Sequence, residues 1–351
     1  MNNRRVTILL GTCLYVWVAS ALGAGSSGQN LAQGAGRPLV GTPAPSLVLK
    51  TIDGKTIDLG RLYGKQAVYL KFWATWCVPC REQMPHFEHA YETAGPDLAV
   101  IAINTGFNDS IEEVLKYRRK LGITMPIVLD DGEVGAAFHL RVTPQHIVIG
   151  RDGRILYVGH LADAILDAAL VAARTAPPAG KSNAAAPVAT PRILRQYKPG
   201  DILASQRSLT IDGKHVSLRD PEKRRPTLLV FLSPWCESYL ATTRPTLSAN
   251  CRVLRERVDA LTGEKGVRWL GIASGLWATS NDLRDYRKQY GVRIPLSLDD
   301  TGVLFREFDV MQVPTALLVD SGGRVERRLD SQDLASPAAL HAALHAAMGS
   351  P

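Results

Sequence analysis

The stretch WATWCVPC, residues 73–80, follows the apolar run AVYLKF at residues 67–72 and decides the fold. A strand that delivers two cysteines, two residues apart, to the start of a helix is the arrangement that thiol–disulfide exchange requires. Unpaired N–H groups at the helix start stabilise a thiolate at Cys77, and Cys80 follows one turn later. We therefore predict that Cys77 attacks and that Cys80 resolves the mixed disulfide.

Such a cysteine pair could also be half of a zinc site or a buried structural disulfide. The chain has five cysteines, and no second Cys-x-x-Cys or Cys/His pair follows at the spacing of zinc ligands. Redox chemistry is therefore favoured. We expect no metal and no cofactor beyond the redox-active disulfide of Cys77 and Cys80.

The motif and its surroundings resemble the thioredoxin superfamily, and within it the membrane-tethered or periplasmic reductases of the TlpA/ResA kind. The resemblance covers most of residues 40–175 and rests on FWATWCVPCR at 72–81, on Met84-Pro85, and on VTP at 142–144 before an apolar strand. It implies that Pro144 is cis and lies against the sulfurs. It also implies an α/β fold with a central mixed sheet. The expected supporting residues of the active site are Trp76, Pro79, Lys71, Thr143 and Pro144.

Two positions depart from the family pattern. Lys71 stands where thioredoxin has a buried acid, and Gln83 stands where ResA-like reductases have a glutamate. A buried lysine near the sulfurs would tend to lose its proton and could then accept one. The alternative is that Lys71 extends to a strand edge and has no role in catalysis.

The chain contains an internal repeat. TIDGKTIDL at 51–59 recurs as TIDGKHVSL at 210–218, and each copy begins 26 positions before a cysteine, Cys77 or Cys236. Both copies read as Asp-Gly hairpins. Val313-Pro314 recurs in the place of Thr143-Pro144. The sequence thus predicts two tandem thioredoxin-like domains.

We expect each domain to contain a central mixed β-sheet flanked by helices, as alternating strands and amphipathic helices indicate. The first domain is predicted over residues 38–174 and the second, with a degenerate motif, over 198–349. The segment between them is rich in alanine and proline, which is typical of a semi-extended linker. The predicted layout is a signal segment at 1–24, a linker at 175–197, and the two domains.

The second motif reads Cys236-Glu237-Ser238-Tyr239, so a tyrosine takes the resolving position. Three interpretations remain open. The domain is a decayed module that only binds partners or packs on the first domain; or Cys236 pairs with Cys251 in a structural or switchable disulfide; or Cys236 is a one-cysteine peroxidatic or mixed-disulfide site, with Pro314 as a further candidate residue. One straight helix would hold Cys236 and Cys251 roughly 22 Å apart, so pairing requires the chain to fold back at Pro245.

The amino terminus predicts export. A basic start, MNNRR, precedes a mostly apolar run at 6–18 and the small residues ASA at 19–21, which together indicate a secretory signal peptide. An uncleaved membrane anchor is the alternative. Cys13 lies inside this segment. We expect a periplasmic protein, either free or anchored at its N-terminus.

The formal net charge of +8 does not indicate nucleic-acid binding, because the basic residues are spread over both domains without a Lys/Arg block. Arg252, Arg255 and Arg257 are expected on a solvated helix face. The expected partners are exported proteins with disulfides and a membrane or periplasmic electron donor.

Histidines raise one further possibility, since a Cys pair with a histidine can bind copper. His146, His139 and His160 are the candidates in the first domain. The favoured function is an exported thiol:disulfide oxidoreductase, most simply a reductase of substrates such as apocytochrome c or copper-site proteins. The alternatives are a non-catalytic adaptor, a copper-delivery protein, and peroxidase-like activity at Cys236.

Overall fold

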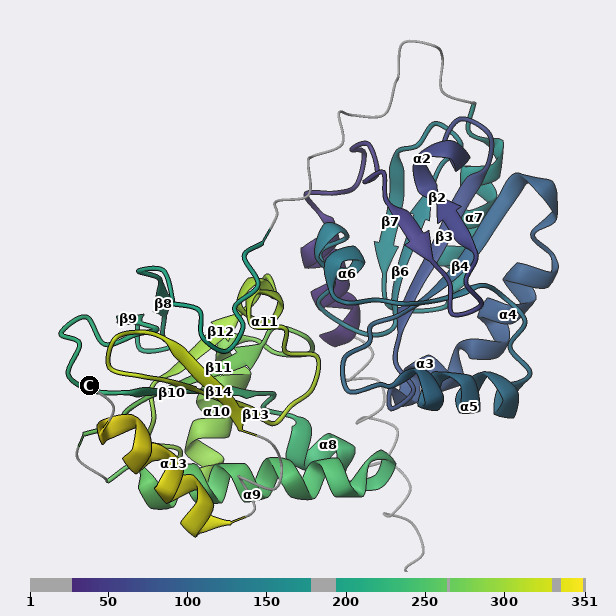
Figure 1. Ribbon diagram of the computed structural model, residues 1–351. Helices are drawn as coiled ribbons and strands as arrows, with labels where there is room; N and C mark the ends of the chain where they lie inside the picture. Colours follow the sequence, from purple (N-terminus) through teal and green to yellow (C-terminus); the bar gives the residue numbers. More distant parts are fainter. Residues whose placement is uncertain (1–26, 178–193, 264–265, 330–335, 350–351) are drawn as a thin grey trace, which may run out of the picture.

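A computed structural model describes residues 27–177, 194–263, 266–329 and 336–349. The predicted signal segment at 1–24 and most of the predicted linker at 175–197 lie outside these residues. The described residues form two α/β units of similar design (Figure 1). This arrangement confirms the expected fold class of two tandem thioredoxin-like domains.

The first domain has a central five-stranded sheet in the order β5-β4-β3-β6-β7. Strands β3, β4 and β5 run parallel, whereas β6 is antiparallel to both β3 and β7. A helix over residues 27–36 precedes the small hairpin of β1 and β2. The elements are β1 (Val48–Lys50), β2 (Thr56–Asp58), α2 (Leu59–Leu62), β3 (Ala67–Trp73), α3 (Val78–Glu82), α4 (Met84–Glu92), β4 (Leu98–Asn104), α5 (Ile111–Leu121), β5 (Ile127–Leu129), α6 (Glu133–Ala137), β6 (Gln145–Ile149), β7 (Ile155–Gly159) and α7 (Ala164–Thr175).

The second domain repeats this topology with the sheet order β12-β11-β10-β13-β14. After the motif it has the short helix α8 and then the longer helix α9. The elements are β8 (Arg207–Leu209), β9 (His215–Ser217), β10 (Thr227–Leu232), α8 (Cys236–Thr243), α9 (Pro245–Leu261), β11 (Arg268–Ser274), α10 (Ser280–Tyr290), β12 (Leu296–Asp299), α11 (Val303–Glu307), β13 (Thr315–Val319), β14 (Val325–Leu329) and α13 (Pro337–Gly349).

Strand β3 is buried along its whole length because it lies at the centre of the first sheet, between β4 and β6. A strand with neighbours on both sides and helices on both faces needs an apolar side chain at almost every position, and this explains the continuous run at 67–72. Strand β10 has the same place in the second sheet. Both strands point their carboxyl ends at the segment that carries the cysteine motif.

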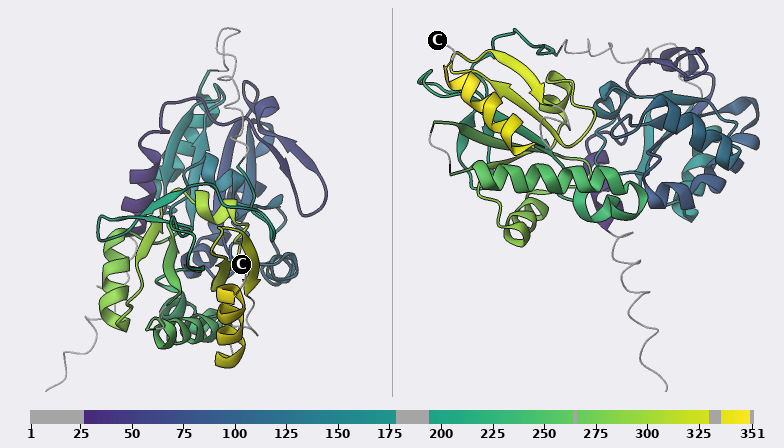
Figure 2. Two further views of the ribbon diagram at one scale, coloured as in Figure 1. Left: turned by 60° about the vertical axis from the view of Figure 1, so that its left-hand side comes forward. Right: turned by 60° about the horizontal axis from the view of Figure 1, so that its bottom comes forward.

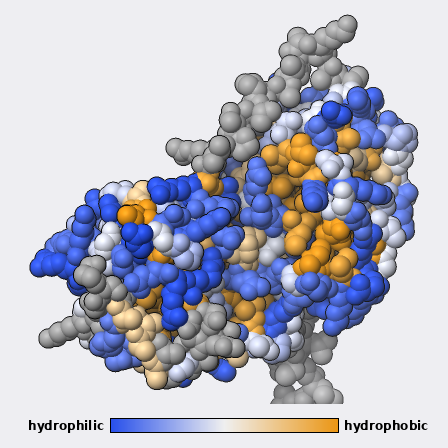
Figure 3. All heavy atoms as spheres, viewed as in Figure 1, coloured by the Kyte–Doolittle hydropathy of each residue, from blue (hydrophilic) through white to orange (hydrophobic). Residues whose placement is uncertain are grey.

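The two domains pack against each other through their motif-bearing ends (Figure 2). One contiguous apolar cluster runs through both domains and includes Trp76, Cys77, Cys236 and Phe305. In the view of Figure 3, apolar residues gather on the face of the first domain, whereas the second domain shows a largely hydrophilic face. Among the described residues, no helix is both long enough and apolar enough to cross a membrane.

Candidate active site

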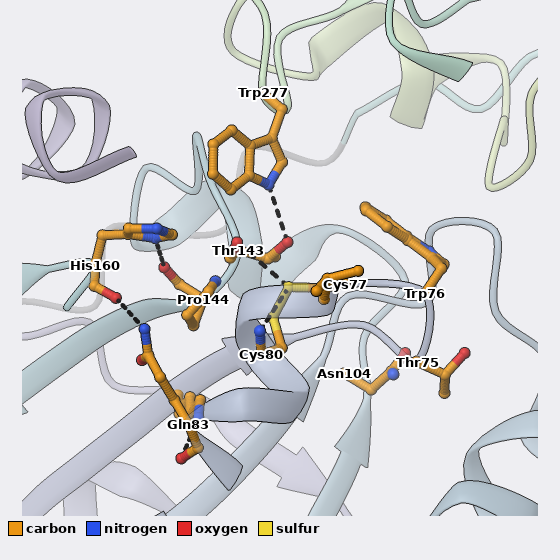
Figure 4. Close-up of a disulfide and its surroundings, with 12 residues drawn as sticks. Thr75, Trp76, Cys77, Cys80, Gln83, Asn104, Thr143, Pro144, His160 and Trp277 are labelled. Atoms are coloured by element: carbon orange, nitrogen blue, oxygen red, sulfur yellow. Dashed lines mark hydrogen bonds between the residues drawn. A yellow bond between two sulfur atoms is a disulfide. The ribbon is translucent and has the colours of Figure 1, made fainter. Parts of the chain in front are cut away.

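The Cys77–Cys80 disulfide lies at the N-terminus of α3, directly after β3 (Figure 4). Cys77 is the N-cap residue, and its sulfur accepts a hydrogen bond from the backbone N–H of Cys80 at 3.1 Å. Pro79 stands in the first turn, where a missing N–H costs nothing. The start of a helix therefore directs N–H groups at Cys77, as thiolate stabilisation requires.

The Thr143–Pro144 peptide bond is cis and brings the loop before β6 against the disulfide. The carbonyl oxygen of Thr143 lies 3.4 Å from the sulfur of Cys77. A cis X-Pro bond places the two flanking residues in a tight turn, so this backbone stays next to the sulfur. The structure thus brings Thr143 and Pro144 to the cysteines, and the roles assigned to them stay predictions.

Buried polar contacts hold the loop between β3 and α3. The indole N–H of Trp76 donates to the carbonyl of Phe107 at 2.8 Å. Asp109 accepts from the backbone N–H of Thr75 and from the side-chain amide of Asn104, both at 2.8 Å. Burial raises the pKa of Asp109, and these hydrogen bonds act in the opposite direction. Through these hydrogen bonds the carboxylate of Asp109 anchors the motif loop.

Lys71 is fully buried in the middle of β3, with a side chain that is 0% exposed. Of the two alternatives for Lys71, the extension to a strand edge is therefore wrong, because β3 is a central strand. Its ammonium nitrogen donates to the backbone carbonyl of Gln83 at 3.0 Å, at the C-terminal end of α3. Burial lowers its pKa to about 7. Lys71 is therefore a buried group that can gain or lose a proton near neutral pH.

Two buried histidines lie beside this lysine. His146 accepts from or donates to Tyr69 through Nδ1 at 2.8 Å, and its Nε2 lies 2.9 Å from the side-chain oxygen of Gln83. Since an amide oxygen only accepts, Nε2 carries the proton and Tyr69 donates to Nδ1. His160 contacts the carbonyl of Pro144 through Nδ1 at 2.6 Å. Burial lowers the pKa of both histidines, so both are neutral at pH 7.

The third histidine considered as a copper ligand lies apart from these two. His139 is near the carbonyl of Ala35, at 3.4 Å, on the exposed side of the domain. Within the described ranges, no group of three or more His, Cys, Asp and Glu side chains could hold a metal ion.

The second-domain cysteines form a disulfide, Cys236–Cys251, with their Cα atoms 6.2 Å apart. This pairing is possible because α8 ends at Thr243 and the chain turns back at Arg244 into α9. One continuous helix would have kept the two sulfurs apart. The Val313–Pro314 bond is cis like its counterpart in the first domain.

Arg255 was expected on a solvated helix face, and this expectation is wrong. Its side chain is largely buried and forms a double hydrogen bond with Glu237, at 2.7 and 3.1 Å. Glu237 follows Cys236, and Arg255 lies one helical turn after Cys251. The ion pair therefore joins the same two helices, α8 and α9, that the second disulfide links.

Several residues at the first disulfide come from the second domain, and sequence reasoning missed them. The hydroxyl of Tyr239 accepts from the backbone N–H of Val78 at 2.9 Å. The indole N–H of Trp277 donates to the hydroxyl of Thr143 at 3.2 Å (Figure 4). No local sequence signal points to these contacts, because each joins residues more than a hundred positions apart.

The arrangement of a disulfide at a helix N-terminus, a facing cis-proline and a mixed sheet defines a thioredoxin-fold thiol–disulfide site. In agreement, residues 40–158 match the model of the AhpC/TSA family. The thiol-disulfide oxidoreductase ResA of Bacillus subtilis is 33% identical over 120 residues, which are 34% of this chain and 65% of the relative. ResA of Halalkalibacterium halodurans is 37% identical over 120 residues, 34% of this chain and 66% of the relative. The chain thus spans just under two thirds of the length of these relatives.

The thioredoxin-like protein YneN of Bacillus subtilis is 34% identical over 122 residues, which cover 34% of this chain and 71% of that protein. A thiol:disulfide interchange protein from Chlorobium tepidum, known from a crystal structure, is 30% identical in sequence. The match covers 38% of this chain and 96% of that protein, with a TM-score of 0.35. This chain belongs to the thioredoxin-like redoxin family of the TlpA/ResA type.

Proposed function

We propose that this protein is an exported thiol:disulfide oxidoreductase that acts through Cys77 and Cys80, most simply as a reductase of protein disulfides. The observation that carries the proposal is the position of the Cys77 sulfur. It lies at the N-terminus of α3, accepts from the N–H of Cys80, and faces the cis-proline loop at Thr143. These features favour a thiolate at Cys77 over one at Cys80.

In the reductive direction the Cys77 thiolate attacks one sulfur of a substrate disulfide and releases the other as a thiolate. The Cys80 thiolate then attacks the Cys77 sulfur in the mixed disulfide, so the substrate leaves reduced and Cys77–Cys80 is oxidised. An electron donor must reduce this disulfide again. Exported proteins with disulfides, including apocytochrome c or copper-site proteins, are the proposed substrates, and a membrane or periplasmic protein is the proposed donor.

Cys80 must lose its thiol proton before it can attack, and the family's usual carboxylates are absent. We infer that Lys71 takes this proton. Its nitrogen bonds to the carbonyl of Gln83, three residues after Cys80 on the same helical segment. Because its pKa is about 7, a large fraction of the side chain is neutral at physiological pH and able to accept a proton.

The test compares Cys77→Ser and Cys80→Ser in the reduction of a disulfide-bonded test protein. We expect both variants to lose turnover, and only Cys80→Ser to accumulate a mixed disulfide, since it keeps the attacking thiol. Turnover at the wild-type rate in either variant would refute the assignment. A redox titration with differential alkylation then decides the direction. A potential of roughly −230 mV or lower supports a reductase, and one near roughly −120 mV supports an oxidant.

A further inference from the structure

The second domain covers the first disulfide. Trp277 lies over the cis-proline loop at Thr143 (Figure 4). The hydroxyl of Tyr239 accepts a hydrogen bond from the backbone N–H of Val78, the residue next to Cys77. In this arrangement Cys77 is 1% exposed. Thiol–disulfide exchange depends on the access of the attacking sulfur. A protein thiol can therefore reach the Cys77–Cys80 disulfide only after the second domain moves.

The cover has an approximate two-fold symmetry, because equivalent loops of the two domains hold each other. The backbone N–H of Asn108 donates to the carbonyl of Met311, and that of Trp277 donates to the carbonyl of Arg141, both at 2.8 Å. Met311 and Arg141 stand at equal distances before the two cis-prolines. Each domain therefore offers the face that surrounds its own cysteine motif.

The tryptophans that precede the two motif cysteines meet in the middle of this interface. Trp76 and Trp235 are stacked with ring centroids 5.0 Å apart. A cavity of about 430 Å³ remains between the domains, lined by residues such as Arg141 and Met311. Neither Cys77 nor Cys80 is among the described residues that line it. The first disulfide is therefore not part of the wall of this cavity.

Helix α8 and the turn after it contribute further polar contacts to the cover, beside those of the loops. Tyr239 lies in α8, and Arg244 follows its last residue. Arg244 forms an ion pair with Asp109 at 2.8 Å, a hydrogen bond to the hydroxyl of Thr75 at 2.5 Å, and a second ion pair with Glu113. Arg244 thus contacts Asp109, the carboxylate that anchors the loop of the first motif. Helix α8 and Arg244 therefore hold the part of the cover that lies on the first motif.

The Cys236–Cys251 disulfide links α8 to α9. Cys236 is the first residue of α8, and Cys251 lies in the second turn of α9. The ion pair of Glu237 with Arg255 joins the same two helices. Without the disulfide, α8 is a helix of eight residues, and a helix of this length keeps its place only through tertiary contacts.

We propose that Cys236–Cys251 is a second redox site, whose disulfide keeps α8 closed over Cys77 and whose reduction opens the first site to protein substrates. The inference rests on the proposed function of Cys77 and Cys80. It assigns the second domain a gating role. The reductant would be a dithiol, which also supplies the electrons for the first site.

Reduction of the Cys236–Cys251 disulfide is an ordinary thiol–disulfide exchange. Cys251 is the more exposed of the two cysteines, at 9%. A thiolate of the dithiol attacks its sulfur, and the bond between Cys251 and Cys236 breaks. Cys236 leaves as a thiolate and takes a proton. The second thiolate of the dithiol then displaces Cys251, so the dithiol ends as a disulfide and its two protons reside on the two cysteines.

The experiment uses the full chain and follows the reduction of Cys77–Cys80 by a folded protein dithiol and by dithiothreitol, with alkylation and peptide mass spectrometry. The main variant is Cys236→Ser with Cys251→Ser. We expect reduction by the protein dithiol to be at least about ten-fold faster than in the wild type, because the open state becomes more populated. An unchanged rate in the folded double variant would overturn the proposal.

A second pair of variants tests the cover without touching the disulfide, in case the double variant does not fold. Tyr239→Phe removes one hydroxyl, and Arg244→Met removes the ion pairs. We expect both to speed the reaction with the protein dithiol, with the larger effect for Arg244→Met. Arg252→Met is the control, since Arg252 is exposed on α9, and it should react at the wild-type rate. Wild-type rates in both Tyr239→Phe and Arg244→Met would refute the cover.

Two outcomes separate this inference from the proposed function. If the wild type and every variant fail to exchange with dithiothreitol at Cys77–Cys80, the proposed function is wrong and the gate has nothing to control. If Cys77–Cys80 exchanges normally while Cys236–Cys251 stays oxidised at every potential that reduces the first site, only the inference about the second site is wrong.

Discussion

The ammonium nitrogen of Lys71 lies 3.0 Å from the backbone carbonyl oxygen of Gln83, and this contact joins the central strand to the end of the helix that carries Cys80. This lysine is fully buried, so its charge loses the solvation that water would give, and the Gln83 carbonyl and the face of the Phe87 ring compensate only in part. Two predictions follow from the lowered pKa of this side chain.

The first prediction concerns stability. The folded chain holds Lys71 at a pKa of about 7, whereas an unfolded lysine titrates near 10.5. Between these two values the unfolded state binds more protons, so Lys71 makes the free energy of unfolding rise with pH from about 7 to about 10.5. Lys71→Met should unfold at a higher denaturant concentration than the wild type at pH 7. The difference should shrink by pH 10, and an equal difference at both pH values would contradict the prediction.

The second prediction concerns the release step. Lys71→Met should leave the attack by Cys77 intact and slow the attack by Cys80, so that the mixed disulfide with a substrate lasts longer. The effect should be large above pH 7, where Lys71 is mostly neutral, and small below about pH 6, where it is charged and cannot accept a proton. Rapid acid quenching and mass spectrometry measure the lifetime. Equal lifetimes in both proteins at pH 8 would exclude Lys71 as the proton acceptor.

The third prediction concerns Asp109, whose side chain is 0% exposed and pairs with Arg244 of the second domain. Asp109→Ala leaves Thr75, Asn104 and Arg244 without their acceptor and should lower the free energy of unfolding by about 2–4 kcal/mol. Asp53→Ala is the matched control. Asp53 is 42% exposed and also pairs with an arginine, so its loss should cost no more than about 1 kcal/mol. Chemical unfolding measures both, and similar costs would contradict the assigned anchoring role.

The fourth prediction concerns the stacked pair Trp76 and Trp235. A double-mutant cycle with Trp76→Ala and Trp235→Ala should give a coupling energy of about 0.5–1.5 kcal/mol in unfolding. A cycle between Trp76 and Trp269 serves as the control, since Trp269 packs in a separate core cluster of the second domain. The control coupling should be near zero. No coupling between Trp76 and Trp235 would mean that the domain faces do not meet in solution.

Much of the first site could be predicted from local sequence. Cys77, Pro79 and Cys80 lie within four residues, so the strand-to-helix turn that places them depends on neighbouring residues alone. The cis bond at Pro144 followed from a family resemblance, and the structure contains it. The burial of Lys71 could not be predicted from local sequence, because a single lysine in an apolar run is compatible with an edge strand as well as with a central strand.

The sequence by itself indicated two similar domains, because TIDGKTIDL recurs at the same 26-residue spacing to a cysteine, and the resemblance of the first motif to the thioredoxin superfamily indicated their fold. It left open the state of Cys236 and Cys251, since their separation depends on whether the chain turns at Arg244. Only the tertiary structure decided that Tyr239 and Trp277 lie on the first active site. Contacts across 161 and 134 positions depend on how two folded surfaces fit together, and no local pattern records that fit.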